Sequence, residues 1–213
     1  MKTERNSSLL KNQAYEELKE LILTRKFPPG SFLSERSLAD QLGMSITPIR
    51  SALDRLKFDG VVDVSPQQGA VVRILPLHEV EDLFELRLIL ETYIVRQLAG
   101  RLTAQQKAIL ADNIHHQEQC LRQEDILWFS KLDTAFHVHL SKFHGNREME
   151  KMMLNASDKF NLVFSDMLHR HPARMQDAYL EHSNIIEELI HGDAQSAANQ
   201  MEIHLISGKK LLL

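Results

Sequence analysis

One aspartate and three histidines in the second half of the chain have the residue types of a transition-metal site. Asp133 and His137 are four residues apart, so on a helix both project from one face about a turn apart. His182 and His204 each have apolar neighbours at helical spacing, which predicts that both imidazoles face the interior. Carboxylate and imidazole groups that converge in a helical core bind divalent transition metals. We therefore expect a metal site at these four side chains, with zinc or nickel as its ion.

The spacing leaves a second interpretation open, because inward histidines often form a buried polar network with a carboxylate and no metal. Other histidines could also compete as ligands. His144 lies nearly three turns from Asp133 on the same helical face and is the main rival, whereas His139 points elsewhere. Four further histidines are expected to be solvated: His115, His116, His169 and His171.

A helical scaffold has to position these groups. After residue 76 the sequence shows amphipathic segments separated by caps or breakers, and no strand pattern. The expected helices cover about 78–101, 103–122, 124–144, 147–170, 173–191 and 193 to the C-terminal leucines. Helices with such short connections pack as an antiparallel bundle.

The first part of the chain has the pattern of a winged helix-turn-helix. Residues 34–43 and 45–59 predict two short helices around a tight turn, with Ser34 and either Ser45 or Thr47 as N-caps. Valine-rich segments on both sides of residues 66–69 then predict a two-stranded hairpin. The fold class is therefore mostly α, with a winged helix-turn-helix domain over 8–75 and an all-α antiparallel bundle over 76–213.

The second short helix carries groups that can read DNA. Ser45, Thr47 and Arg50 lie on its outward side near the N-terminus, where serine or threonine can contact phosphate or methyl groups and arginine can read guanine. Gly69 would let the wing approach the adjacent backbone or minor groove. A helix-turn-helix also packs in this way in proteins that never touch DNA, so this alternative stays open.

Composition is consistent with a folded, cytoplasmic DNA-binding protein. The chain has 213 residues, 43% hydrophobic content and a net charge of −4. Residues 1–75 hold 11 Lys or Arg and 9 Asp or Glu, giving +2, which leaves −6 for residues 76–213. No membrane segment or signal peptide is apparent, and the single Cys120 cannot form an intrachain disulfide.

Several motifs resemble those of one family of bacterial regulators. Residues 33–39 (LSERSLA), residues 45–53 (SITPIRSAL) and Gly60 closely resemble the N-terminal domain of the GntR family. The second half resembles that family's FadR-type (FCD) ligand-binding domain, and the number of helices suggests its shorter, VanR-like form. The matching positions in the second half are Glu85-Leu86-Arg87, Asp133, Phe136-His137, His182 and His204-Leu205.

The resemblance implies a homodimer that binds a palindromic operator in double-stranded DNA and responds to a small carboxylate effector. It places the four metal-site residues at the family's metal-binding positions and Arg87 in the effector pocket, where a guanidinium can hold a carboxylate. A buried ion pair with Glu91 is the alternative for Arg87. The family usually has arginine where this chain has Ile46, which suggests either a different operator or more weight on Arg36, Thr47 and Arg50 for DNA contact.

Two other functions compete with a ligand-responsive repressor or activator. An aspartate and three histidines could activate water in a metal-dependent hydrolase or dioxygenase, although no general base is evident and the winged domain would have no purpose. Alternatively, the helical half could be a plain dimerisation module in which His182 and His204 are core polar residues.

Overall fold

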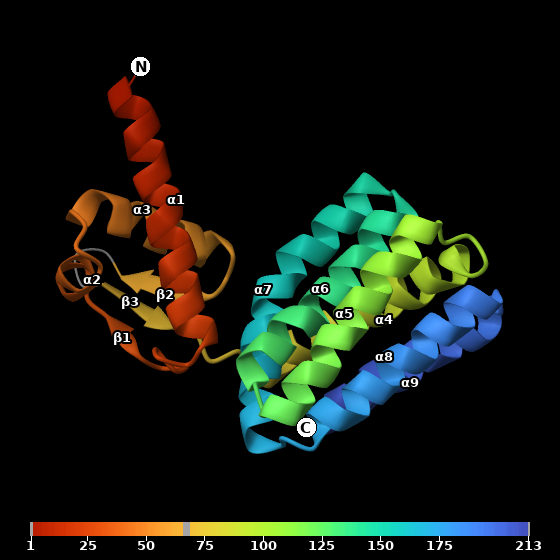
Figure 1. Ribbon diagram of the computed structural model, residues 1–213. Helices are drawn as coiled ribbons and strands as arrows, with labels where there is room; N and C mark the ends of the chain where they lie inside the picture. Colours follow the sequence, from red (N-terminus) through yellow and green to blue (C-terminus); the bar gives the residue numbers. More distant parts are fainter. Residues whose placement is uncertain (1, 66–68, 213) are drawn as a thin grey trace. The chain divides into compact units, whose positions relative to one another are not determined.

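The structure is a computed structural model that describes residues 2–65 and 69–212. The chain divides into two compact units at the boundary between Leu75 and Pro76. Figure 1 shows a small sheet among the helices of the first unit, and helices only in the described part of the second. The predicted fold class is therefore confirmed.

The first unit is a winged helix-turn-helix with one strand more than predicted. Its elements are α1 (Lys2–Leu23), β1 (Phe32–Leu33), α2 (Glu35–Leu42), α3 (Ile46–Phe58), β2 (Val62–Ser65) and β3 (Gly69–Val72). The antiparallel sheet has the order β1-β3-β2, with Phe32 opposite Val71 and Val64 opposite Ala70. A two-residue strand such as β1 is too short to show an alternating pattern, which is why the sequence indicated a hairpin only.

The N-caps of α2 and α3 differ from what the sequence predicts. Ser34 and Ser45 occupy the N-cap positions, but neither side chain makes a capping hydrogen bond. Gly43 ends α2 in the left-handed conformation, with φ of 62°. Burial of Ile49, Leu53 and Leu56 stabilises α3 instead, because these side chains form one apolar face against the core.

The second unit is the expected succession of helices. They are α4 (Leu77–Leu98), α5 (Ala104–Gln123), α6 (Ile126–His144), α7 (Arg147–Arg170), α8 (Arg174–His191) and α9 (Ala194–Lys210). Thr103 and Asp193 cap their helices as predicted, Thr103 through a reciprocal capping box with Gln106. The predicted start of α6 at Glu124 is wrong, because Glu124 adopts a left-handed φ of 54° and ends α5.

Packing in this unit brings α6, α8 and α9 around a common interior. Helix α9 packs against α4 and α8, while α6 packs against α4, α5 and α7. The core includes Ile94, Phe136, Leu140, Ile185 and Met201. Gly100 donates its backbone N–H to Leu189 O at 2.9 Å, which ties the end of α4 to the end of α8.

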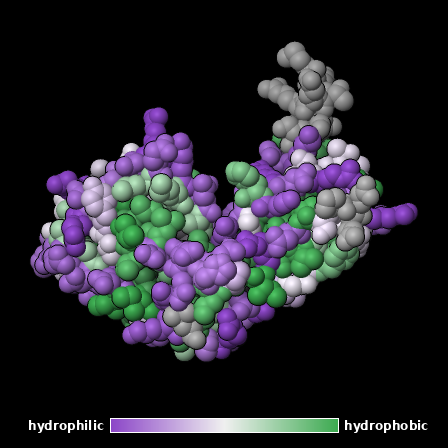
Figure 2. All heavy atoms as spheres, turned by 180° about the vertical axis from the view of Figure 1, so that it is seen from behind, coloured by the Kyte–Doolittle hydropathy of each residue, from purple (hydrophilic) through white to green (hydrophobic). Residues whose placement is uncertain are grey.

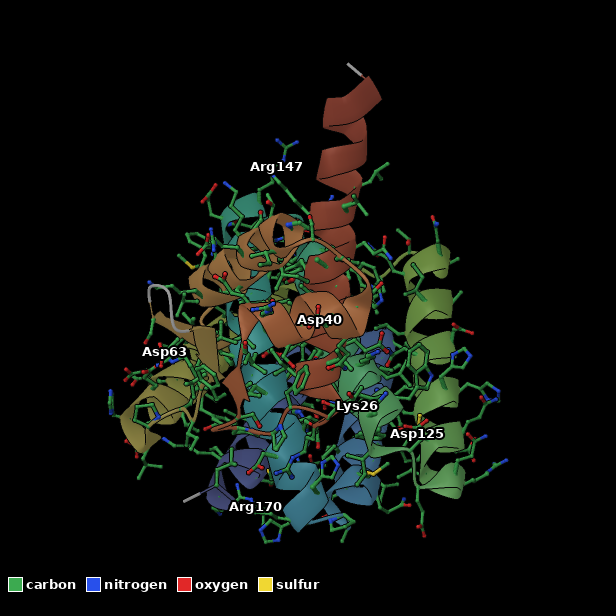
Figure 3. The ribbon with its side chains drawn as sticks, turned by 90° about the vertical axis from the view of Figure 1, so that its left-hand side faces the viewer. Lys26, Asp40, Asp63, Asp125, Arg147 and Arg170 are labelled. Carbon is green, nitrogen blue, oxygen red and sulfur yellow. The ribbon has the colours of Figure 1, made fainter. Side chains whose placement is uncertain are left out.

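The surface is mixed in character. Figure 2 shows hydrophobic residues gathered within hydrophilic surroundings on the visible face of the helical unit. Helices α4 and α9, which pack together, leave Ile89, Tyr93 and Ile203 exposed. Charged side chains mark the helix ends, as with Arg147 and Arg170 at opposite ends of α7 in Figure 3. None of the helices in the described ranges combines the length and apolar composition needed to span a membrane.

Candidate metal centre and DNA-binding surface

The helical unit brings the four predicted metal ligands together. One ligand atom from each of Asp133, His137, His182 and His204 lies within 4.8 Å of the others. All four side chains are buried, and they come from α6, α8 and α9. The Nε2 atom of His204 lies 3.2 Å from Nε2 of His137 and 3.3 Å from Nε2 of His182, so three ring nitrogens meet at one point.

In each imidazole, the ring nitrogen that does not face the cluster, Nδ1, lies beside a hydrogen-bond acceptor. His137 Nδ1 contacts Glu91 Oε2, His182 Nδ1 lies 2.9 Å from Gln117 Oε1, and His204 Nδ1 lies 2.7 Å from Glu181 Oε2. Carboxylate and amide oxygens only accept, so these contacts favour the tautomer with the proton on Nδ1 in all three rings. The three Nε2 atoms therefore direct lone pairs at one another.

The acceptors are themselves fixed by other side chains. Arg87 Nε donates to Glu91 Oε1 at 2.6 Å, and Arg174 holds both oxygens of Glu181, at 2.8 and 2.5 Å. Gln117 donates its Nε2 to Asn113 Oδ1 at 2.7 Å, which leaves its own Oε1 facing His182. Such partners fix the tautomer and orientation of ligating histidines in metal sites.

Asp133 completes the cluster. Among the described residues neither of its carboxylate oxygens has a hydrogen-bond partner. Oδ1 lies 3.5 Å from His182 Nε2, and Oδ2 lies 3.9 Å from His137 Nε2. Burial raises the pKa of Asp133 to about 7, against the opposing effect of Arg87 and Arg174. A buried, charged carboxylate without a partner is costly, so Asp133 has to be neutralised by a proton or paired with a cation.

Burial also depresses the pKa of each of the three imidazoles well below its usual value, and the charge of Arg174 adds to this effect. The rings are therefore neutral, the form in which histidine binds metals. Three converging neutral nitrogens and one unpartnered carboxylate fit a divalent transition-metal ion.

Arg87 forms the ion pair that the sequence left open as its alternative role, and its contact with an effector stays a prediction. Arg87 forms this buried pair with Glu91, yet its Nη1 and Nη2 atoms are buried without a hydrogen-bond partner among the described residues. The guanidinium lies 3.7 Å from the ring centroid of Phe160. Together with His137, Arg87 lines a cavity of about 10 Å³, which is room for one water molecule.

Sequence reasoning missed Glu181, Arg174 and Gln117, which hold His182 and His204. Their signals were weak: Glu181 precedes His182 directly, and Arg174 stands two turns before Glu181 on the same helix. Charged and amide residues at such positions are normally solvated. The rival His144 lies outside the four-residue cluster and packs edge-on against Tyr93, while His139 stacks on Phe143.

The predicted DNA-contacting side chains of the first unit are mostly exposed. Arg36 is exposed at the start of α2, and Ser45 and Thr47 are exposed at the start of α3. Arg50 is exposed too, but its guanidinium forms an ion pair with Glu35, at 2.8 Å between Nη2 and Oε2. This pair lowers the pKa of Glu35 through its hydrogen bond. Glu35 therefore fixes the direction of Arg50.

Gly69 has a structural role at the start of β3. It is buried, with φ of +121°, and a Cβ atom there would lie 2.4 Å from Leu33 O. Only glycine allows β1 to come so close. Contact of Gly69 with DNA stays a prediction. The predicted wing tip, Pro66 to Gln68, lies outside the described residues.

A winged helix-turn-helix followed by a helical bundle with a buried Asp–His cluster is the architecture of a DNA-binding transcription regulator. Comparison with known families agrees for both units. Residues 10–72 match the family described as bacterial regulatory proteins, gntR family, and residues 82–207 match the FCD domain. The chain therefore belongs to the GntR family of bacterial regulators and carries an FCD domain.

Individual relatives are also named as transcriptional regulators. The chain is 35% identical over 139 residues to the Nta operon transcriptional regulator of Aminobacter aminovorans, which covers 64% of this chain and 65% of that protein. It is 32% identical over 130 residues to a helix-turn-helix regulator from the TAR-I ttuE-ttuC' intergenic region of Agrobacterium vitis, covering 60% and 76%. These relatives and families are regulators, so the chain is not an enzyme and the hydrolase or dioxygenase alternative is set aside.

A solved structure supports the fold. Escherichia coli McbR/YncC aligns with a TM-score of 0.82 over 95% of this chain and 96% of that chain, at 22% sequence identity. At this identity the likeness concerns the fold alone.

Proposed function

We propose that this regulator is a homodimer that binds a palindromic operator and responds to a small organic acid beside a metal ion in the helical unit. The observation that carries this proposal is the set of three Nε2 lone pairs and the unpartnered Asp133 carboxylate around one point. Zinc and nickel are the ions that we expect. The bound ion would supply positive charge and a position for an oxygen ligand.

Arg87 supports the choice of an anionic effector. Its Nη1 and Nη2 atoms have no hydrogen-bond partner in the described part of the chain, and Arg87 lines the same cavity as His137. A carboxylate can accept two parallel hydrogen bonds from a guanidinium, which would satisfy both nitrogen atoms at once. The cavity holds no more than a water, so a larger effector requires movement of its walls. That movement is the structural change that we assign to effector binding.

Dimerisation is the part of the proposal that would transmit this change. Exposed apolar side chains on α4 and α9 provide a surface that a second copy can cover. An effector that binds one dimer geometry more tightly than another shifts the equilibrium between them and, with it, the spacing of the α3 helices on DNA.

Metal content tests the proposal directly. Protein purified in the presence of zinc or nickel and then freed of unbound ion should contain about one ion per chain by elemental analysis. His182→Ala should lower this content to background, because it removes one converging nitrogen. His144→Ala is the matched control and should retain the ion, since His144 lies outside the cluster. Equal metal content in wild type and His182→Ala would contradict the assignment.

A further inference from the structure

We propose that Ile46 recognises a thymine in the operator by contact with the 5-methyl group of that base, close to a guanine that Arg50 contacts. This inference rests on the proposed operator binding and adds part of the base sequence that is read. It follows from the position of Ile46 on α3, from its exposure and from the chemistry of the base edges.

Ile46 lies at the end of α3 that meets the bases in a helix-turn-helix. It is the first residue of α3, which is the second helix of the motif. The second helix of such a motif lies in the major groove, and the residues at its N-terminus contact the base edges. Ser45 and Thr47, on either side of Ile46, are exposed as well. The start of α3 therefore presents one apolar side chain between two hydroxyl groups.

Ile46 does not belong to the core of the winged unit. It is 43% exposed, whereas Ile49 and Leu53, on the inner face of the same helix, are 0% and 1% exposed. Residues four apart in an α-helix differ by only about 40° around its axis, because one turn takes 3.6 residues. Ile46 and Arg50, both exposed, therefore share one outward face about a turn apart.

Arg50 gives the position of the thymine relative to another base. Its Nε and Nη2 atoms donate to the two carboxylate oxygens of Glu35, at 3.0 and 2.8 Å, which uses one edge of the guanidinium. The edge formed by Nη1 and Nη2 can donate to O6 and N7 of a guanine. Four residues span about 6 Å along a helix, which is nearly two steps of about 3.4 Å between bases. The thymine should therefore lie within about two base pairs of this guanine.

The chemistry of the base edges selects thymine for Ile46. In the major groove every base presents hydrogen-bond donors or acceptors, and thymine adds a methyl group. The side chain of isoleucine has neither donor nor acceptor, so covering a polar edge with it would leave that edge unpaired. Contact with the methyl group instead removes two apolar surfaces from water. Ile46 thus favours thymine over the three other bases.

Replacing thymine by deoxyuridine tests the inference, because deoxyuridine lacks only the 5-methyl group. An operator is first selected from a random duplex library with the full-length protein. Each thymine is then replaced in turn, and the dissociation constant is measured by fluorescence anisotropy at a fixed salt concentration. We expect a loss of affinity of about fourfold at one thymine in each half-site, within about two base pairs of a guanine.

Three variants assign the contact to one side chain. Ile46→Ala shortens the side chain and should remove most of the difference between the thymine and deoxyuridine duplexes. Thr47→Ser removes another methyl group at the start of α3 and keeps the hydroxyl group, so the difference should persist whatever the overall affinity. Phe58→Ala is the matched control, because Phe58 is 87% exposed at the opposite end of α3, and it should retain the difference.

The outcomes separate the inference from the proposed function. An operator without a thymine near such a guanine, or without any effect of deoxyuridine, would overturn the inference and leave operator binding standing. The same holds if Ile46→Ala keeps the full fourfold loss. If the wild-type protein enriches no sequence, the proposed operator binding itself is overturned. The deoxyuridine measurement on the wild type is decisive even if Ile46→Ala fails to fold.

Discussion

At the scale of single residues, opposite charges are used in two different ways. In the helical unit, Arg87 and Arg174 neutralise the glutamates that hold His137 and His204, so these imidazoles stay neutral and oriented. In the winged unit, the exposed pair Arg50–Glu35 contributes little to stability, because solvent screens it. Its effect is to hold an arginine in place at the surface of α3.

Arg50 is expected to matter for DNA recognition. A selection of binding sites from a random duplex library should enrich a defined sequence with the wild-type protein, and Arg50→Ala should abolish this enrichment without changing the melting temperature. Arg101→Ala is a suitable control, because Arg101 is exposed in the helical unit. The same enriched sequence and affinity for Arg50→Ala would show that α3 does not read DNA through this residue.

The four cluster residues could be predicted from sequence because each is a metal-binding type at a helical position with apolar neighbours. Their supporting residues could not. Gln117 lies 65 positions from its partner His182 along the chain, and nothing in its local sequence distinguishes it from a solvated glutamine. Its role depends on the packing of α5 against α8, and the spacing of residues along the chain does not predict which helices pack together.

At the scale of elements, the limits of the helices could be predicted from N-caps and apolar periodicity. Strand β1 could not be predicted in this way. Strand β1 exists because Phe32 and Leu33 pair with Val71 and Ala70, residues far away in the sequence. The close approach of this pair of strands requires the glycine at position 69. Gly69 is therefore required for the packing of β1 against β3, and its contact with DNA stays a separate prediction.

Gly69→Ala should therefore destabilise the winged unit. The left-handed φ and the 2.4 Å approach to Leu33 O together predict a loss of about 1–3 kcal/mol. The single Trp128 lies in α6, so its fluorescence follows the helical unit, and far-UV circular dichroism follows both units. In urea unfolding, Gly69→Ala should move part of the change in circular dichroism to a lower urea concentration. The midpoint of the change in Trp128 fluorescence should stay where it is in the wild type.

Gly43→Ala provides the comparison. Gly43 also has a positive φ, of 62°, but nothing lies within 4 Å of its Cβ position, so its cost should be about 1 kcal/mol. Equal costs for the two substitutions would argue against the steric explanation for Gly69.

At the scale of the whole molecule, the cluster links stability to pH. Without a metal ion, His137, His182 and His204 are neutral in the folded state and would each take up a proton on unfolding below their usual pKa of 6.5. Asp133 has the opposite effect, because its folded pKa of about 7 exceeds its usual 3.8, so it releases a proton on unfolding. On unfolding, the three histidines together take up three protons and Asp133 releases one, so the net uptake is two protons.

The free energy of unfolding of metal-free protein should therefore fall as the pH decreases from 6.5 towards 4, by about 2–3 kcal/mol per pH unit from these groups. Other carboxylates also titrate, so the informative quantity is the difference between the wild type and His182→Asn. The variant loses one of the three histidines, which should reduce the slope by about 1.4 kcal/mol per pH unit. Urea unfolding of chelator-treated protein measures both slopes, and identical slopes would contradict the neutral state of His182.

The convergence of α6, α8 and α9 on one point has a topological consequence. A cation bound there would join positions 133, 137, 182 and 204, closing long loops of the chain in the way that a disulfide does. Removing it with a chelator would then resemble reducing a crosslink in a protein whose single cysteine offers no covalent one. Under the proposed function the ion would act as a reversible crosslink, and the supply of metal would set the stability of the helical unit.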